Sequence, residues 1–153
     1  MFRGVTAINI DTKGRLVMPS RYREQLLAKD AKPIVMTIDT DERCLLLYPL
    51  TAWEIIEQKL AELPSFNQAA RRIQRLLIGH AAETELDNNG RFLVPPLLRE
   101  YASLKKHVVL VGQGKKIEIW DENLWQERRS LWLQEEAATD STLLPDEVKW
   151  LSL

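Results

Sequence analysis

The sequence has few of the residues that form disulfides and most protein metal centres. Cys44 is the only cysteine, and His80 and His107 are the only histidines. A single cysteine excludes a disulfide within the chain, and so few sulfur and imidazole ligands argue against a structural zinc site. We therefore expect no bound metal and no other cofactor. Cys44 lies in an apolar run and is predicted to be a small core residue rather than a nucleophile.

Hydrophobic stretches are also short. No apolar run approaches the roughly 18 residues needed to span a membrane, and the first residues, MFRGVTAINI, lack the apolar segment of a signal peptide. The 153 residues, 45% of them hydrophobic and 28% charged, are typical of one soluble globular protein. The sequence therefore predicts a cytoplasmic protein without a membrane partner.

Charge is nearly balanced overall but unevenly spread. The net charge of −1 by itself argues against a nucleic-acid partner, because proteins that bind nucleic acid usually carry a basic face. Residues 1–25 hold five basic and two acidic side chains, whereas residues 121–153 hold three basic and eight acidic ones. This asymmetry is compatible with one surface that faces nucleic acid. An ordinary solvated surface is the alternative.

What the sequence does contain is a repeat. IDTKGRLVMP at residues 10–19 returns as LDNNGRFLVP at residues 86–95. At this offset of 76 residues the matched pairs are Asp11 with Asp87, Gly14 with Gly90, Arg15 with Arg91, Pro19 with Pro95, Arg23 with Arg99 and Glu24 with Glu100. Further along the offset falls to 72, and Tyr48 aligns with Trp120 and Trp53 with Trp125. Such a repeat indicates that one supersecondary unit was duplicated because it cannot bury its apolar face alone.

Each copy predicts the element order β-β-α-β-β. DTKG and DNNG separate short β-rich runs, and Asn-Gly is a strong hairpin signal because both residues accept positive φ. Pro19 and Pro95 end these strands, and short helices are expected at residues 20–28 and 96–104. A second hairpin follows each helix, residues 33–39 with 43–49 in the first copy and 107–112 with 116–121 in the second.

Further helices are expected between and after the copies. TAWE at residues 51–54 has capping-box spacing and opens a helix to about residue 63, and SFNQ at residues 65–68 opens a second one that Gly79 ends. Another helix is expected over residues 122–138. The predicted organisation is a first repeat at 1–50, a helical linker at 51–80, a second repeat at 81–121, and a C-terminal helix with an acidic tail at 122–153.

The two D-x-x-x-R loops, in a tandem β-β-α-β-β chain that starts MFRG, resemble the MraZ family. RYREQL, CLLLYPL, WEIIEQKL and RLLIGHA also match that family's pattern, so the likeness covers about residues 1–125. The resemblance implies an α+β fold in which two tandem AbrB-like swapped-hairpin repeats form a pseudo-dimeric barrel, and chains that assemble into a ring as a homo-oligomer. It also implies a bacterial transcriptional regulator encoded at the start of the division and cell wall gene cluster. Such a regulator binds double-stranded DNA at direct repeats in the promoter of its own operon, as a nucleoid-associated repressor.

The loops supply the candidate DNA contacts. An arginine at the base of a β-turn can reach the major groove, where its guanidinium pairs with O6 and N7 of guanine, while a neighbouring lysine serves a phosphate. Arg15 and Lys13 suit these roles in the first loop. Arg91 holds the matching place in the second loop, whose tip carries asparagines instead of a lysine, and Arg3 is a further phosphate candidate.

Four other loop residues are expected to be structural: Asp11, Gly14, Asp87 and Gly90. Aspartates in turns commonly accept backbone amides, and here they can also orient the arginine. The alternative for Arg15 is a solvated turn residue whose ion pair with Asp11 contributes about 0 to 1 kcal/mol.

Other functions remain open. An antitoxin-like DNA binder would place its acidic tail on a protein partner. An enzyme or a phosphate-binding module is a third class, but GQGKK at residues 112–116 lacks the Walker spacing and no helix start follows, so we interpret it as a hairpin tip. No acid, base and nucleophile stand together, so we predict no catalytic residue and no small-molecule substrate. Two sets are left out of the site: Arg71, Arg72 and Arg75 as ion-pairing residues, and Tyr48, Trp53, Trp120 and Trp125 as packing residues.

Overall fold

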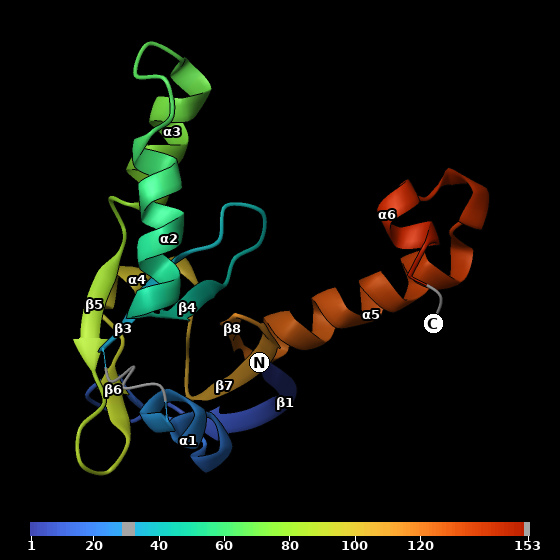
Figure 1. Cartoon of the computed structure of the whole chain (residues 1–153). Coiled ribbons are helices and arrows are strands. Elements are labelled where there is room, and N and C mark those ends of the chain that lie inside the picture. The colour runs from blue at the N-terminus through green and yellow to red at the C-terminus, as the bar shows by residue number, and fades with distance from the viewer. Residues whose placement is uncertain (29–32, 152–153) are drawn as a thin grey trace. The chain divides into compact units, whose positions relative to one another are not determined.

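The computed structural model describes residues 1–28 and 33–151. These residues divide into two compact units, Met1–Glu122 and Asn123–Leu153. The first unit holds both copies of the repeat, and the second holds most of the C-terminal helix and the acidic tail (Figure 1).

A six-stranded antiparallel sheet forms the centre of the first unit. Its strands, in spatial order, are β1 (Phe2–Asn9), β7 (His107–Gly114), β8 (Lys116–Asp121), β4 (Leu45–Pro49), β3 (Pro33–Ile38) and β5 (Ala82–Glu85). The hairpins β3/β4 and β7/β8 confirm the second hairpin predicted for each copy. They join edge to edge through β4 and β8, which brings the two copies into one sheet.

The first predicted hairpin of each copy is wrong as a strand pair. β1 pairs with β7 and β5 pairs with β3, so the first strand of each copy completes the second hairpin of the other copy. The second strands, β2 (Arg15–Val17) and β6 (Arg91–Leu93), pair with each other as a separate two-stranded ribbon. The turn residues specify only that the chain reverses. Which strand each arm pairs with depends on the burial of apolar side chains that are far apart in the sequence.

The predicted barrel is also wrong, because the sheet is open. A barrel closes only when its first and last strands pair. β1 and β5 are the sheet's edges, and across the two described ranges they form no ladder with each other or with the β2/β6 ribbon. With only three residues each, β2 and β6 do not extend the sheet; they cover one of its faces with Leu16 and Phe92.

The sheet is covered on both faces. One face packs against the ribbon and the helices α1 (Ser20–Ala28) and α4 (Pro96–Tyr101), with core side chains that include Leu16, Tyr22 and Phe92. On the other face Val35, Leu46 and Tyr48 pack against Trp53 of α2 (Leu50–Ala61). Tyr48, Trp53 and Trp120 are buried, as the packing prediction requires.

The helices α1 and α4 occupy the predicted places, although α4 is shorter than predicted. α4 ends at Tyr101 rather than residue 104 because Ser103 adopts φ 53°. The Ser103 amide then donates to the carbonyl of Glu100 and the Leu104 amide to that of Arg99, both 3.1 Å or less, which is a Schellman ending formed without glycine.

The two linker helices form an antiparallel pair beside the sheet (Figure 1). Both predicted capping boxes are wrong. α2 begins at Leu50 and its N-cap residue is Pro49, whereas the predicted box made Thr51 the N-cap residue. α3 (Gln68–Leu77) is capped by Asn67, whose side chain accepts the Ala70 amide at 3.1 Å, so Asn67 and not Ser65 satisfies the first turn.

The second unit is helical. It contains α5 (Glu122–Ala138) from Asn123 onward, a 3₁₀ turn (Ser141–Leu143) and α6 (Asp146–Lys149). Trp125 packs edge-on against Trp132 at 6.1 Å between ring centroids, and the Arg128 guanidinium lies over the Trp132 ring. Among the residues that the structure describes, no helix is both long and apolar enough to cross a membrane.

Candidate nucleic-acid interface

The first loop is organised around the Asp11 carboxylate. Oδ1 of Asp11 accepts the backbone amides of Lys13 at 2.9 Å and Arg15 at 2.8 Å, while Oδ2 accepts Nε of Arg15 at 2.8 Å. The Gly14 amide closes the turn on the Asp11 carbonyl at 3.0 Å. One carboxylate therefore holds both the turn backbone and the base of the arginine fork.

The second loop repeats this geometry. Oδ1 of Asp87 accepts the amides of Asn89 and Arg91, and Oδ2 accepts Nε of Arg91 at 2.8 Å. Arg15 and Arg91 use only Nε in these contacts, and within the described chain their Nη atoms have no partner. Side-chain exposure is 31% for Arg15 and 35% for Arg91. Each guanidinium is thus oriented by an aspartate yet keeps its outer edge available.

The β2/β6 ribbon places the two arginines on one face. Arg15 lies opposite Leu93, Leu16 opposite Phe92, and Val17 opposite Arg91. Because strand side chains alternate between faces, buried Leu16 and Phe92 form the inner face, while both arginines belong to the outer face with half-exposed Val17 and Leu93. Burial of Leu16 and Phe92 stabilises the fold by about 1.5–3 kcal/mol each, which holds the outer face in position.

The glycine of each loop is in contact with an arginine from the helix of the other copy. Arg23 of α1 lies against Gly90, where a Cβ would stand 2.4 Å from its Cζ, and Arg99 of α4 lies in the same way against Gly14, at 2.6 Å. The glycines have φ of +75° and +84°. Their carbonyls accept the amides of Met18 and Val94 of the other copy at 2.8 and 2.9 Å.

Arg23 and Arg99 contact the loops of the opposite copy, a role that the sequence prediction missed. They also donate to the carbonyls of Met18 and Val94, so each one ties the end of a ribbon strand to a helix. The signal for them was present, since they form a matched pair at the repeat offset. The sequence does not reveal that each supports the loop of the opposite copy.

The other two predicted DNA contacts, Lys13 and Arg3, lie on different elements. Lys13 is exposed at the tip of the first loop. Arg3 is exposed on β1, an edge strand of the six-stranded sheet, and so lies outside the ribbon and its loops. The structure therefore brings Arg15, Arg91 and Lys13 together on one ribbon and its loops, and leaves Arg3 apart.

Both loop aspartates have a lowered pKa. For Asp11 the largest cause is the Arg15 amide, which lowers the pKa. Burial, the second-largest cause, opposes it, and the Arg15 guanidinium and the Lys13 amide lower the pKa further; Asp87 has the equivalent causes. A lowered pKa in the folded state means that the carboxylate stabilises the fold above the ordinary value of 3.8 and loses this effect only as the pH falls through the lowered value. The loops should therefore stay intact throughout the neutral range.

An NMR titration of the Asp11 and Asp87 side-chain carboxyl carbons tests this expectation. We predict titration midpoints below 3.8 for both groups. The Arg15→Ala variant should raise the Asp11 midpoint only in part, because the amide at position 15, which is the largest cause, remains. An Asp11 midpoint at or above 3.8 in the wild-type protein would contradict the loop geometry.

A second cluster, inside the first unit, contains metal-ligand types. One ligand atom each of Asp39, Cys44 and Glu118 lies within 4.8 Å of the others. The Cys44 thiol donates to Asp39 Oδ2, and Trp120 and Gln113 donate to Glu118 Oε1. Burial above all, and then Glu118, raises the pKa of the Cys44 thiol, which fits its role as the hydrogen donor to Asp39. The contacts described for this cluster are hydrogen bonds within the first unit.

A sequence model of one protein family matches nearly the whole chain. It matches twice, over residues 1–76 and 77–144, and is described as "MraZ protein, putative antitoxin-like". The chain belongs to the MraZ family. Each of the two MraZ matches contains one of the aspartate and arginine loops, so the family model matches each copy of the duplication separately.

The chain is similar over its full length to proteins that are named transcriptional regulator MraZ. The chain is 60% identical to the protein from Legionella pneumophila (strain Corby) and 57% identical to that from Halorhodospira halophila (strain DSM 244 / SL1), with all of each chain covered. It is 55% identical to the protein from Coxiella burnetii (strain RSA 493 / Nine Mile phase I), again over both entire chains. The MraZ likeness thus includes the acidic tail, beyond residue 125 where the resemblance in the sequence alone ended.

Proposed function

We propose that this chain is a sequence-specific DNA-binding transcriptional regulator that represses its own division and cell wall operon. It would place the outer face of the β2/β6 ribbon in the major groove. The names of its MraZ relatives support the regulatory part of this proposal. The observation that carries the DNA-binding part is the ribbon, which presents Arg15 and Arg91 side by side with their Nη atoms available.

The dimensions suit base recognition. A two-stranded ribbon fits the major groove of B-form DNA, and an arginine Nη pair matches O6 and N7 of guanine. Arg15 and Arg91 are diagonal neighbours across the β2/β6 ladder, so their Cα atoms are about 7–8 Å apart. That separation corresponds to about two base steps of 3.4 Å. We propose that Lys13 contacts a phosphate beside Arg15, and that Arg3 contacts phosphate only where DNA extends beyond the ribbon.

The two ends of the ribbon differ in chemistry. The first loop tip carries Thr12 and Lys13, and the second carries Asn88 and Asn89. Each subunit therefore binds DNA with a defined polarity. Subunits joined head to tail keep that polarity around a ring, and such a ring would read direct repeats spaced about one helical turn apart, near 10 bp.

A ring also explains how a chain of net charge −1 binds a polyanion. A few phosphate contacts give non-specific dissociation constants of about 10⁻⁴ to 10⁻⁶ M, whereas linked sites raise avidity by about 10² to 10⁴. We propose that interleaving of the two copies, as in the AbrB-like swapped-hairpin fold, supplies the two loops of each subunit. No enzymatic activity, cofactor or small-molecule substrate enters this proposal, and its place of action is the nucleoid.

Titration of DNA from the region upstream of the chain's own gene tests the proposal. We expect affinity to rise by about 10² or more from one to three copies of the bound sequence, and to fall when one copy is inverted. Mobility-shift assays at one fixed salt concentration measure both effects. If a single copy bound as tightly as three, the ring mechanism would be excluded; if none bound better than unrelated DNA, sequence-specific binding itself would be.

The antitoxin-like alternative keeps the same DNA face but assigns the acidic tail to a different protein. The family description favours considering it. Co-purification of the full-length chain with a stoichiometric protein partner, lost on removal of residues 139–153, would support this reading. A full-length chain that purifies without any other protein and still represses would support the proposal above.

A further inference from the structure

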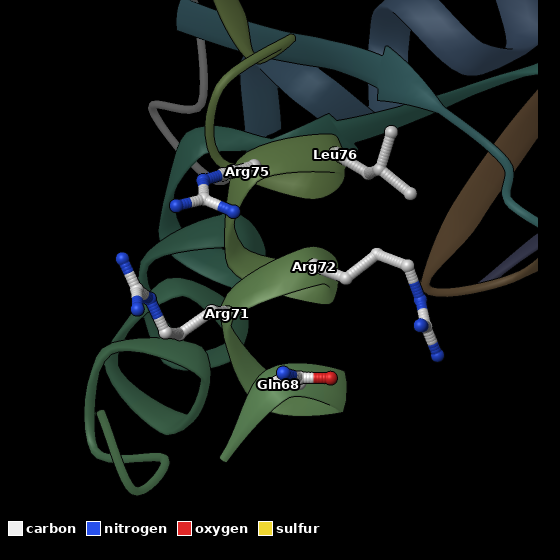
Figure 2. Close-up of a pocket in the computed structure, with 5 residues that line it drawn as sticks. All are labelled: Gln68, Arg71, Arg72, Arg75 and Leu76. Carbon is white, nitrogen blue, oxygen red and sulfur yellow. The ribbon is translucent and has the colours of Figure 1, made fainter. Parts of the chain in front are cut away.

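Helix α3 carries a basic surface that the proposed DNA contacts do not use. Arg71, Arg72 and Arg75 are exposed and line a shallow pocket together with Gln68 and Leu76. Figure 2 shows the three guanidinium groups extending away from the helix, with Arg71 and Arg75 on one side and Arg72 on the other. We call these three side chains the α3 arginine surface.

The three arginines form no ion pair with any residue that the structure describes. Residues 65–80 contain these three arginines and no acidic residue. Ion pairs are seen instead in the two loops, between Arg15 and Asp11 and between Arg91 and Asp87. Arg75 lies four residues from Arg71 and on the same side of the helix (Figure 2), so these two like charges are neighbours and repel each other. A bound acidic group would remove this repulsion.

Exposed apolar side chains precede α3 in the chain. Phe66, in the turn that leads into α3, is 90% exposed. Leu63, which follows α2, is also exposed. The α3 end of the linker therefore offers positive charge together with uncovered apolar surface, a combination suited to an acidic segment that also contains hydrophobic residues.

The chain contains such a segment in its C-terminal unit. Residues 133–151, called here the acidic tail, hold five acidic residues and one lysine, a net charge of −4. Within the tail Leu143 is 80% exposed and Trp150 77% exposed. The tail therefore matches the α3 end of the linker in both charge and apolar character.

We propose that the α3 arginine surface binds the acidic tail of a second copy of this chain. Two different surfaces of one chain that complement each other form a heterologous contact, and a heterologous contact repeated around an axis closes a ring. This inference rests on the ring of the proposed function and names the contact that joins its subunits. DNA phosphate, the chain's own tail and an unrelated protein are the competing occupants.

Charge reversal tests the contact from both sides. One variant carries Arg71→Glu, Arg72→Glu and Arg75→Glu, and the other carries Glu135→Arg, Glu136→Arg and Glu147→Arg. Like charges then face each other in either variant, so each should require at least about tenfold more protein to assemble, as measured by mass photometry without DNA. All six positions are exposed, and circular dichroism checks that each variant folds.

Mixing the two variants in equal amounts distinguishes the tail of a second copy from the chain's own tail as the group that binds the α3 arginine surface. Each reversed α3 surface then meets a reversed tail on another molecule, so assembly should recover to within about threefold of wild type. A single chain that carries all six changes provides the comparison. If assembly recovered in this chain but not in the mixture, each tail would bind the α3 surface of its own chain, and the proposal would be wrong. A Lys105→Glu, Lys106→Glu, Lys115→Glu variant controls for net charge, because these lysines are exposed and lie outside α3.

The remaining outcomes also decide the matter. If wild-type chains associate but neither reversal changes association, the inference fails while the ring survives. If the α3 variant assembles normally and loses only DNA affinity, the surface binds phosphate and the inference is wrong. If wild-type chains are monomeric at every concentration, the ring of the proposed function fails, and this contact fails with it.

Discussion

Replacement of both Arg15 and Arg91 by alanine is expected to lower affinity for the specific DNA by about 10³-fold or more, leaving binding close to the non-specific level. Each arginine that pairs with a guanine contributes about 1–3 kcal/mol of discrimination, and assembly multiplies the loss over several subunits. Arg15→Ala alone should cost more than Arg91→Ala, because only the first loop pairs its arginine with an exposed lysine, Lys13.

The fold should survive these substitutions. Both ion pairs are about one-third exposed, and exposed pairs contribute about 0 to 1 kcal/mol each. Loss of both pairs should therefore lower the free energy of unfolding by at most about 2 kcal/mol. The unfolding midpoint falls by about 2–4 °C for each kcal/mol lost. Binding is measured by fluorescence anisotropy at fixed salt and stability by thermal denaturation.

Two further variants make the interpretation specific. Arg15→Lys keeps the charge but cannot pair bidentately, so it should lose most of the specificity and little of the non-specific affinity. Arg43→Ala removes an exposed arginine from a different loop and should change neither. If Arg15→Ala unfolded the protein, the loop would be a structural element, and its assignment to DNA recognition would be wrong.

The second large effect is expected at the loop glycines. Replacement of Gly14 and Gly90 by alanine should destabilise the fold by about 2–4 kcal/mol, since positive φ costs an L-residue about 1–2 kcal/mol at each position. The new Cβ atoms would also stand 2.4–2.6 Å from the Cζ atoms of Arg23 and Arg99, so these guanidiniums must move away. We expect a lower unfolding midpoint, by about 2–4 °C per kcal/mol, together with weaker DNA binding.

A double-mutant cycle separates the two causes at Gly90. Arg23→Ala makes room for a methyl group but does not change φ. If crowding contributes, the cost of Gly90→Ala should be smaller in the Arg23→Ala background, with an interaction free energy of about 0.5 kcal/mol or more. Strict additivity would assign the whole effect to backbone strain, and an alanine at both glycines with no effect on stability would contradict the loop conformation described here.

Sequence reasoning succeeded where the controlling interactions are local. The bounds of α1 and α5 and the pairings of β3 with β4 and β7 with β8 follow from apolar patterning and turn residues within short segments. Local competition explains the errors in detail. Asn67 competes with Ser65 as a cap two residues away, and Ser103 adopts positive φ although nothing in its residue type requires it.

The errors in topology have a different cause. DTKG and DNNG do reverse the chain, but a turn signal does not specify which strand each arm will pair with. In the structure β1 pairs with β7 of the other copy and not with the hairpin of its own copy. Such a choice depends on the burial of side chains far apart in sequence, including Leu16 and Phe92.

The sequence by itself determined the duplication, the loop residues and the family, because a repeated pattern of aspartate, glycine, arginine and proline can be recognised without coordinates. Only the tertiary structure decided that the sheet is open, that Arg15 and Arg91 share the outer face of one ribbon, and that Arg23 and Arg99 support the opposite loops. Strand register and contacts between copies are non-local, since they depend on which apolar faces can be buried together, and residue types at short range do not carry that information.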